Sequence, residues 1–419
     1  MKRINLIISF LSLISLFSCN KISNSEENKI PKENLLSTIY IASDLHLFSN
    51  NLIDENKKKS ITGDGRIQEF DYQLVQSLVD EVNSSHPNYL VLTGDLTFNG
   101  EKDSHLELIS FLDKIDSSTK VLVIPGNHDI NNISSKSYLD NKIDSVDNIS
   151  YEDFRNLYSK YGYSNGISYD ESTLSYFYKL DENTYGLFID STLSTFNYEE
   201  GLNAIGGYLY ESTFRWIEDN LSMAKKQGKR VISFMHHNLI THNDLFETLY
   251  TLSNSEQLLE LYSQYDVNLN FSGHLHIQSI KSKIMNEKKI YDVCNQSLLD
   301  YGNRYGVLNI YANCYEYSSR RLVNEELLEY SFNTFYKKYY DKSLSSFKSS
   351  YPSNYQELLD FSSKINTYYF DGDYQKIYQI KKARTKIAKY INSNKFDNKY
   401  IKSLMNLPNI NQDQIDIYI

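Results

Sequence analysis

The stretch TIYIASDLH (residues 38–46) sets the pattern of the fold, because it is a short apolar strand that ends in an Asp-x-His pair. The same pattern of a β-rich run followed at once by polar residues returns in NYLVLTGD (88–95) and VLVIPGNHD (121–129). Segments with apolar residues at helical spacing lie between these runs, at 68–82 and 106–115. The alternation predicts parallel strands joined by crossover helices, with the polar residues gathered at one edge of the sheet.

The rest of the chain up to about residue 322 continues this mixed pattern. An insertion at 131–166 contains one predicted helix (151–161), and residues 174–190 predict a strand hairpin. Amphipathic helices are predicted at 213–227 and 256–265, and each precedes a strand that ends in histidines. Those two strands, and three more that complete the region, are predicted at 230–235, 267–271, 289–294, 305–312 and 315–322.

Histidine placement carries the strongest functional signal. Six of the nine histidines fall in four short motifs, and each motif follows a predicted strand: Asp44-Leu45-His46, Gly126-Asn127-His128-Asp129, His236-His237 and Gly273-His274-Leu275-His276. Gly94-Asp95 adds a carboxylate that could bridge two cations. Imidazole, carboxylate and amide ligands suit transition metals such as Mn, Fe, Zn, Co or Ni. In a two-metal site, with ions ~3.5–4 Å apart, a bridging hydroxide attacks phosphorus in line.

Taken together, the five motifs resemble those of the calcineurin-like metallophosphoesterase superfamily, over roughly residues 38–322. The resemblance implies an α/β fold built as a four-layer αββα sandwich. It assigns one metal ion to Asp44, His46, Asp95 and His276, and the other to Asp95, Asn127, His236 and His274. It further implies that His128 contacts the substrate phosphate as general acid or charge stabiliser, with Asp129 orienting its ring.

Two departures from the family pattern bear on the site. The second motif reads Gly94-Asp95-Leu96-Thr97-Phe98-Asn99-Gly100-Glu101, which resembles the branch of class III cyclic-nucleotide phosphodiesterases and makes Asn99 a candidate for substrate contact or support of a ligand. The fourth motif has Asn238 where proline is common, which leaves His236 and His237 as alternative ligands. Position favours His236, with His237 supporting a ligand or facing the substrate.

We therefore predict a hydrolase of small phosphodiesters, with cyclic nucleotides as the leading substrate class. The alternatives are a phosphomonoesterase, a nucleotide or glycerophosphodiester hydrolase at the cell surface, or a surface lipoprotein that binds without catalysis. The net charge of -10 is unevenly spread: residues from Tyr330 onward carry +6 (14 Lys/Arg and 8 Asp/Glu), which leaves -16 before them. The acidic catalytic region argues against a nucleic-acid partner.

The N-terminus predicts export. Lys2 and Arg3 precede an apolar run at residues 4–17, which is too short to span a bilayer. The run closes in Leu16-Phe17-Ser18-Cys19, which resembles a bacterial lipoprotein signal and implies cleavage before Cys19 and lipidation of that residue. Residues 1–18 are then a signal peptide, and 19–36 a flexible tether to the membrane. A plain secretory peptide and an uncleaved anchor are the alternatives.

From about residue 323 to 419, apolar residues recur at helical spacing, which predicts a smaller all-helical C-terminal domain. The phosphoesterase domain is accordingly placed at 37–322. Cys294 and Cys314 either form a disulfide or remain buried thiols, since their spacing fits both. We expect His86 and His105 at the surface or as capping residues, and His242 in a surface loop, with a place in the pocket lining as the alternative. Arg66 either faces water or clamps a phosphate.

Overall fold

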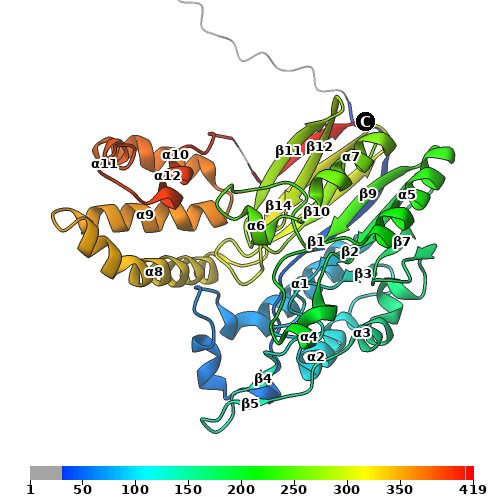
Figure 1. Ribbon diagram of the computed structural model, residues 1–419, viewed down its shortest axis with the longest axis horizontal. Coiled ribbons are helices and arrows are strands. Elements are labelled where there is room, and N and C mark those ends of the chain that lie inside the picture. The colour runs from blue at the N-terminus through cyan, green and yellow to red at the C-terminus, as the bar shows by residue number, and fades with distance from the viewer. Residues whose placement is uncertain (1–30, 411) are drawn as a thin grey trace, which may run out of the picture.

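The computed structural model describes residues 31–410 and 412–419, and two facing sheets form its centre (Figure 1). The six-stranded sheet has the order β15-β14-β13-β1-β2-β3. Its strands are β1 (Leu35–Ala42), β2 (Tyr89–Thr93), β3 (Lys120–Ile124), β13 (Arg304–Tyr311), β14 (Cys314–Arg321) and β15 (Gln414–Tyr418). As the sequence predicts, β1, β2 and β3 are parallel neighbours.

The second sheet has seven strands in the order β11-β12-β10-β9-β8-β7-β6. Its strands are β6 (Ser168–Tyr169), β7 (Tyr176–Lys179), β8 (Thr184–Ile189), β9 (Arg230–Met235), β10 (Leu269–Ser272), β11 (Ser279–Met285) and β12 (Lys288–Cys294). The central strands β8, β9, β10 and β12 run parallel, as crossover helices require. Edge strand β11 pairs antiparallel with β12 and was not predicted. A small two-stranded sheet, β4 (Lys136–Ser137) and β5 (Asp144–Ser145), lies in the insertion.

Helices cover the outer faces and give the four-layer αββα sandwich that the sequence predicts. The largest apolar cluster fills the space between the sheets, where Val91 of one sheet and Phe234 and Phe271 of the other are fully buried. Helix α1 (Asp71–Ser85) and α2 (Lys102–Leu112) pack on the six-stranded sheet. Helices α5 (Glu211–Lys226) and α7 (Ser255–Tyr265) pack on the seven-stranded sheet. Shorter helices are α3 (Tyr151–Leu157), α4 (Asn197–Glu200) and α6 (Glu247–Tyr250).

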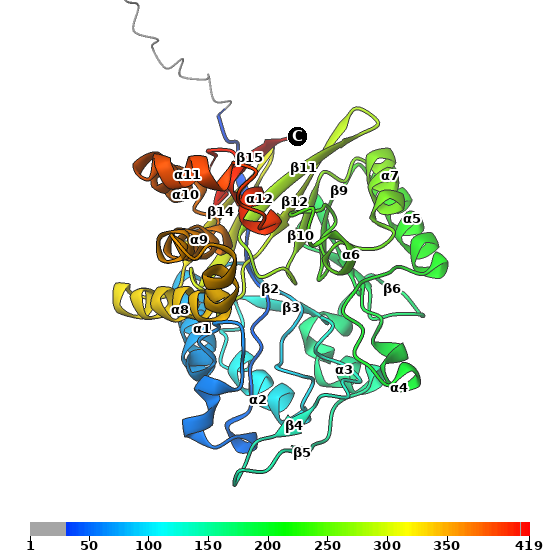
Figure 2. The same ribbon diagram turned by 60° about the vertical axis from the view of Figure 1, so that its left-hand side comes forward.

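The C-terminal region is helical, but the expectation that it contains helices alone is wrong at its end. Five helices stand beside the sheets (Figure 2): α8 (Glu325–Ser350), α9 (Tyr355–Phe370), α10 (Tyr374–Ala383), α11 (Thr385–Ile391) and α12 (Lys399–Met405). The chain then returns to the six-stranded sheet as β15, which pairs antiparallel with β14. The last strand therefore ties the helical region back to the phosphoesterase sheet.

Two further contacts join the helical region to the sheets. Asp371, at the end of α9, is buried and accepts hydrogen bonds from Arg304 Nε and Arg321 Nη2, each at 2.6 Å. Leu275 and Ile277 belong to the same apolar cluster as the buried faces of α9 and α10. The helices thus share a hydrophobic core with the segment that carries His274 and His276.

The N-terminal expectations fall largely on residues that the structure does not describe. Cys19 and the signal peptide lie outside the described residues. The predicted tether extends too far along the chain, because Leu35 and Leu36 are already the first two residues of strand β1. Just before them, Glu33 N donates a hydrogen bond to Asn313 Oδ1 at 3.0 Å. Cys294 and Cys314 are both free and buried, so they form no disulfide with each other. Among the described helices, none is both long and apolar enough to cross a membrane.

Candidate metal centre

The five motifs meet where β1, β2, β3, β9 and β10 end, as the strand order requires. Backbone hydrogen bonds join the loops directly: Asp44 N donates to Gly94 O at 3.0 Å, His46 N to Asp95 O at 3.0 Å, and Gly273 N to His236 O at 2.9 Å. Because the bonds link loops that are far apart in the sequence, each motif fixes the position of the next.

Two glycines allow this close approach. A Cβ atom on Gly126 would lie 2.2 Å from Asp95 N, and one on Gly273 would lie 1.9 Å from Ser43 Oγ. Both distances are far inside van der Waals contact, so only glycine fits at either position. The glycine that precedes Asn127 and the one that precedes His274 are therefore requirements of the site's geometry.

Five of the motif residues adopt left-handed backbone conformations. Their φ values are 52° for Asp44, 41° for His46, 48° for Asp95, 66° for His274 and 59° for His276. Such conformations cost on the order of 1 kcal/mol or more each for residues with a side chain, and they concentrate at functional sites. The surrounding fold holds these residues in strained conformations that turn their side chains toward one another.

The side chains form two groups of potential metal ligands that share Asp95. One group contains Asp44, His46, Asp95 and His276, and the other contains Asp95, His236 and His274, with the ligand atoms of each group within 4.8 Å of one another. Asn127 joins the second group, since its Oδ1 lies 3.2 Å from His236 Nε2. All the residues that the sequence assigned to the two metal ions are thus brought together.

Hydrogen bonds fix which ring nitrogen faces the centre in His236, His274 and His276. His236 Nδ1 lies 2.9 Å from Thr93 O, and His274 Nε2 lies 3.1 Å from Leu249 O. Because a carbonyl oxygen only accepts, these nitrogens carry the protons and the opposite nitrogens present lone pairs. His276 is held in the same way, through Nδ1 at 3.0 Å from Asp300 Oδ2.

This arrangement fits bound metal ions. His236 Nε2 lies 3.3 Å from Asp95 Oδ1, and His276 Nε2 lies 3.3 Å from Asp44 Oδ1. A lone pair that faces a carboxylate oxygen in a buried site is unfavourable unless a cation lies between them. Without metal, protons take that place: although burial opposes it, the neighbouring carboxylates raise the pKa of His236 to about 9 and that of His276 to about 10. Protons and metal ions therefore compete for these nitrogens.

His128 stands at the edge of the centre and belongs to neither ligand group, and its ring packs edge-on against that of His46 with ring centres 4.9 Å apart. Its Nδ1 lies 2.6 Å from Phe98 O and 3.1 Å from Asn99 Oδ1, while Nε2 lies 4.0 Å from Asp95 Oδ2. The side chain is 33% exposed, so Nε2 is open to the pocket. Asn99 thus lies beside the candidate catalytic histidine, where it was expected to contact substrate or support the site.

The expectation that Asp129 orients the His128 ring is wrong. Asp129 is fully buried, and its carboxylate accepts hydrogen bonds from Gly126 N at 2.8 Å, Leu96 N at 3.1 Å and Thr97 N at 2.9 Å. The Phe98 carbonyl instead orients His128. Asp129 is a positioning residue that ties the β2 loop to the β3 loop, which a sequence motif of adjacent residues could not reveal.

His236, and not His237, lies within the ligand group. Both ring nitrogens of His237 point to other partners, Nδ1 at 2.8 Å from Ser191 Oγ and Nε2 at 2.9 Å from Ile205 O. Burial, together with the charge of His236, lowers the pKa of His237 to about 3, so it is neutral. His237 fixes the loop after β8 and does not face the pocket.

His105 and His242 do not lie at the surface, and Arg66 does not face water. His242 is buried with Nε2 at 3.2 Å from Asp292 Oδ2. His105 is buried beneath the site, with Nε2 at 2.9 Å from Asp129 O. Arg66 turns inward, its side chain only 11% exposed, and pairs through Nε with Asp64 Oδ2 at 2.9 Å. His86, in contrast, lies at the surface as expected.

A pocket of about 340 Å³ opens over the two ligand groups. Part of its lining is polar and includes Asp64, Arg66 and His128, and another part, here called the apolar wall, is apolar. The apolar wall combines the phosphoesterase and helical regions: Ile205, Phe246, Tyr250, Leu275 and Phe370. Sequence reasoning found neither Asp300 nor this wall, because none of these residues stands at a fixed spacing from a motif.

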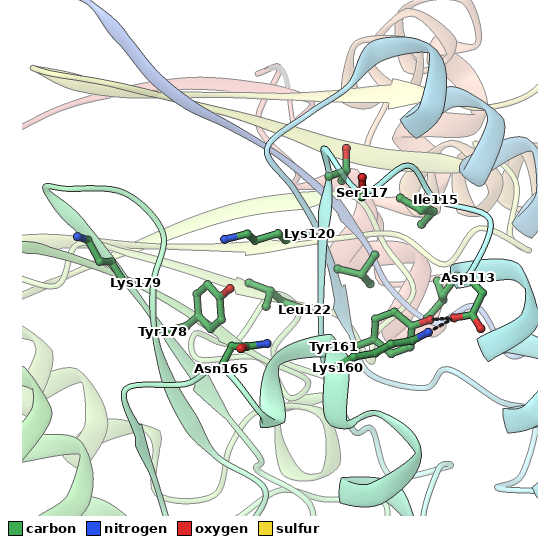
Figure 3. Close-up of a pocket in the computed structure, with 13 residues that line it drawn as sticks. Asp113, Ile115, Ser117, Lys120, Leu122, Lys160, Tyr161, Asn165, Tyr178 and Lys179 are labelled. Carbon is green, nitrogen blue, oxygen red and sulfur yellow. Dashed lines mark hydrogen bonds and ion pairs between the residues drawn. The ribbon is translucent and has the colours of Figure 1, made fainter.

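A second, larger cavity lies at the opposite end of β3 and has no part in this centre. It measures about 670 Å³ and is lined by Lys120 at the start of the strand and by Lys160 and Lys179 (Figure 3). Two of these lysines are already paired, Lys160 with Asp113 at 2.5 Å and Lys179 with Glu182 at 2.7 Å. Because the ligand groups stand at the carboxyl ends of the strands, chemistry is confined to the smaller pocket.

Comparison with known proteins agrees with this geometry. A family model for calcineurin-like phosphoesterases matches residues 37–278, more than half of the chain, so the chain belongs to the calcineurin-like phosphoesterase family. No curated protein matches the sequence. Among solved structures, a dimetal phosphatase from Danio rerio is similar at 12% identity with a TM-score of 0.50, over 70% of this chain and 98% of that chain. A Staphylococcus aureus protein assigned as a 5′-nucleotidase is similar at 12% identity with a TM-score of 0.40, over 72% of this chain and 57% of that chain.

Membership of the family makes this chain a metallophosphoesterase with candidate ligands for a dimetal centre.

Proposed function

We propose that the protein is a binuclear metal-dependent phosphodiesterase. The observation that carries this proposal is that Asp95 belongs to both groups of ligand atoms, as a bridging carboxylate must. In the proposal, Asp44, His46, Asp95 and His276 hold one ion, and Asp95, Asn127, His236 and His274 hold the other. Two bound ions would neutralise charge on the phosphoryl oxygens and lower the pKa of a water nucleophile.

His128 is the proposed general acid of this reaction. Its Nδ1 is held by Phe98 O at 2.6 Å, which leaves Nε2 as the ring nitrogen available for proton transfer to the substrate. The open Nε2 can then protonate the leaving alcohol oxygen. Asn99 Oδ1, 3.1 Å from the same Nδ1, keeps the ring in this orientation.

The charge of the pocket supports a diester in preference to a monoester. Arg66 is the one lysine or arginine in the described lining of the pocket. Asp64 Oδ2 lies 2.9 Å from Arg66 Nε and offsets its charge. A monoester near neutral pH carries about two negative charges, whereas a diester carries one. A pocket with a single, already paired guanidinium therefore suits the diester.

The apolar wall supports a diester with an organic substituent of some size. Phe246, Tyr250 and Phe370 offer aromatic surface to a group attached to the scissile phosphate. A nucleobase has this character, which keeps cyclic nucleotides as the leading substrate class. A nucleotide monoester or a glycerophosphodiester is the second candidate, favoured by the same wall and by the family's coarser activity.

The test is hydrolysis by purified full-length chain loaded with Mn, Fe, Zn, Co or Ni. We expect turnover of bis(p-nitrophenyl) phosphate and a cyclic nucleotide, at least tenfold above p-nitrophenyl phosphate, and its loss in Asp95→Asn and Asn127→Ala. Asp219→Asn, an exposed residue on α5, is the matched control and keeps full activity. A preference for the monoester would establish the second candidate. Absence of turnover by folded protein with every metal would leave only a binding role.

We also propose that the enzyme is exported and anchored to a membrane through lipid on Cys19, on the strength of the Leu16-Phe17-Ser18-Cys19 pattern. Detergent partitioning of wild type and Cys19→Ala tests this. The wild type is expected in the detergent phase and the variant in the aqueous phase. A wild type found wholly in the aqueous phase would contradict the anchor.

A further inference from the structure

A groove of about 360 Å³ lies next to the catalytic pocket, between the loop after β1 and helix α8. Four cations line it, and Asp341 is the one carboxylate in its described lining: Lys59, Arg66, Lys337 and Lys338. The chain as a whole carries a net charge of -10, whereas in this groove four cations face a single carboxylate. Such a groove attracts anions.

Arg66 connects the groove to the catalytic pocket, because it lines both. Nε forms an ion pair with Asp64 Oδ2 at 2.9 Å, but among the described residues neither Nε nor Nη1, both buried, has a hydrogen-bond partner. A buried donor without an acceptor is costly, and an anion would satisfy it.

The fold builds this groove and holds it in shape. Gly65 has a φ of +104°, and a Cβ there would lie 3.1 Å from the Phe335 Cα of α8, so only glycine lets the loop close on the helix. Lys59 Nζ lies 5.0 Å from the ring centre of Tyr330, whose hydroxyl donates to Glu69 at 2.6 Å. These contacts hold the cations of the loop, Lys59 and Arg66, next to Lys337 and Lys338 of α8.

The lysines of the groove are only loosely paired. Lys59 Nζ lies 3.9 Å from Glu69 Oε1, and Lys337 Nζ lies 3.5 Å from Asp341 Oδ2, with all but Glu69 well exposed. Exposed pairs of this kind contribute about 0–1 kcal/mol and exchange readily. Among the described residues, Lys338 has no ion pair within 4 Å. These ammonium groups are free to meet an incoming anion.

We propose that the groove binds a second phosphate group, carried on one of the two alcohols of the scissile phosphodiester. The inference rests on the proposed function and narrows its substrate class to diesters with an additional phosphate. The scissile phosphate lies over the metal centre, Arg66 stands between the two sites, and Lys59, Lys337 and Lys338 hold the second phosphate.

The experiment compares two chromogenic diesters that differ by one phosphate, thymidine 5′-(p-nitrophenyl phosphate) and its 3′-phosphorylated form, with the full chain loaded with Mn. We expect the 3′-phosphate to lower KM about tenfold. The double variant Lys337→Gln/Lys338→Gln is expected to raise KM for the phosphorylated substrate about two- to fivefold per lysine, and to leave the plain diester unchanged. Lys348→Gln, exposed and further along α8, is the matched control and changes neither.

Each possible outcome of this experiment either supports or contradicts the proposed second-phosphate site. Equal KM values for the two substrates in the wild type, or an equal change for both in the double variant, would overturn the second-phosphate site while leaving the phosphodiesterase intact. If neither diester is hydrolysed, the proposed function fails by itself. Calorimetric binding of thymidine 3′,5′-bisphosphate then decides the groove: weaker binding in the double variant than in Lys348→Gln supports it, and equal binding refutes it.

Discussion

His276 Nδ1 and Asp300 Oδ2 lie 3.0 Å apart, and this hydrogen bond turns the opposite nitrogen of the imidazole toward Asp44. Asp300 is buried and comes from the turn after β12, far from every motif. Carboxylates that hold a metal-binding histidine in this way fix both its tautomer and its orientation. Asp300 is therefore part of the metal centre without being a ligand.

Asp300→Asn is expected to weaken metal binding about 10- to 100-fold, because the amide no longer stabilises the required tautomer of His276. Metal content after dialysis against graded chelator, measured by elemental analysis, gives the affinity. The circular dichroism spectrum should not change. Asp219→Asn serves as the control, and an affinity equal to that of the control would show that Asp300 does not hold the ring for metal.

His128→Asn is expected to lower kcat about 10²- to 10⁴-fold for diesters with alkyl leaving groups, because these need a proton as the bond breaks. The loss should be much smaller for p-nitrophenolate, which leaves as an anion. Metal content should stay at the wild-type value, since the His128 ring is in neither ligand group. A loss that is equal for both leaving groups would contradict the role of general acid.

The sequence predicted which side chains meet, because each candidate ligand closely follows a strand of a parallel sheet. Once β1, β2 and β3 are parallel neighbours, Asp44, Asp95 and Asn127 must meet at one edge. At these residues the local sequence pattern is therefore enough to predict where the side chain lies in the fold.

Residues whose roles depend on packing could not be found in that way. Arg66 sits in a polar loop and turns inward only because Gly65 lets the loop close on α8. The strand at 414–418 forms because β14 offers it an open edge, although all the elements between residues 325 and 405 are helices. Both features depend on how distant segments of the chain pack together, which the spacing of apolar residues in the sequence does not predict.

Asp129→Asn is expected to lower the free energy of unfolding by about 2–4 kcal/mol, because one carboxylate satisfies the N–H groups of Gly126, Leu96 and Thr97 and an amide has only one accepting oxygen. Urea unfolding followed by circular dichroism measures the change. Asp219→Asn, on the outer face of α5, should shift the midpoint little. A variant that loses activity at unchanged stability would instead favour a direct effect on the His128 ring.

His105 gives the fold a dependence on pH. It is fully buried between Tyr158 Oη, 2.8 Å from Nδ1, and Asp129 O, 2.9 Å from Nε2. Burial lowers the pKa of His105 from 6.5 to about 4. Between those values the unfolded chain binds a proton that the folded chain does not, so the contribution of His105 to stability is present above about pH 6.5 and is lost as the pH falls toward 4.

In the metal-free protein, the free energy of unfolding of wild type should therefore fall by about 2 kcal/mol more than that of His105→Gln between pH 7 and pH 4.5. Glutamine can still donate to Asp129 O and accept from Tyr158, but it does not titrate. Urea unfolding at several pH values measures the free energy of unfolding of both proteins. Subtracting one pH curve from the other cancels the titrations that both proteins share. His86→Gln, an exposed histidine at the end of α1, should run parallel to wild type. If the curve of His105→Gln also runs parallel to wild type, His105 does not titrate differently in the folded and unfolded chains.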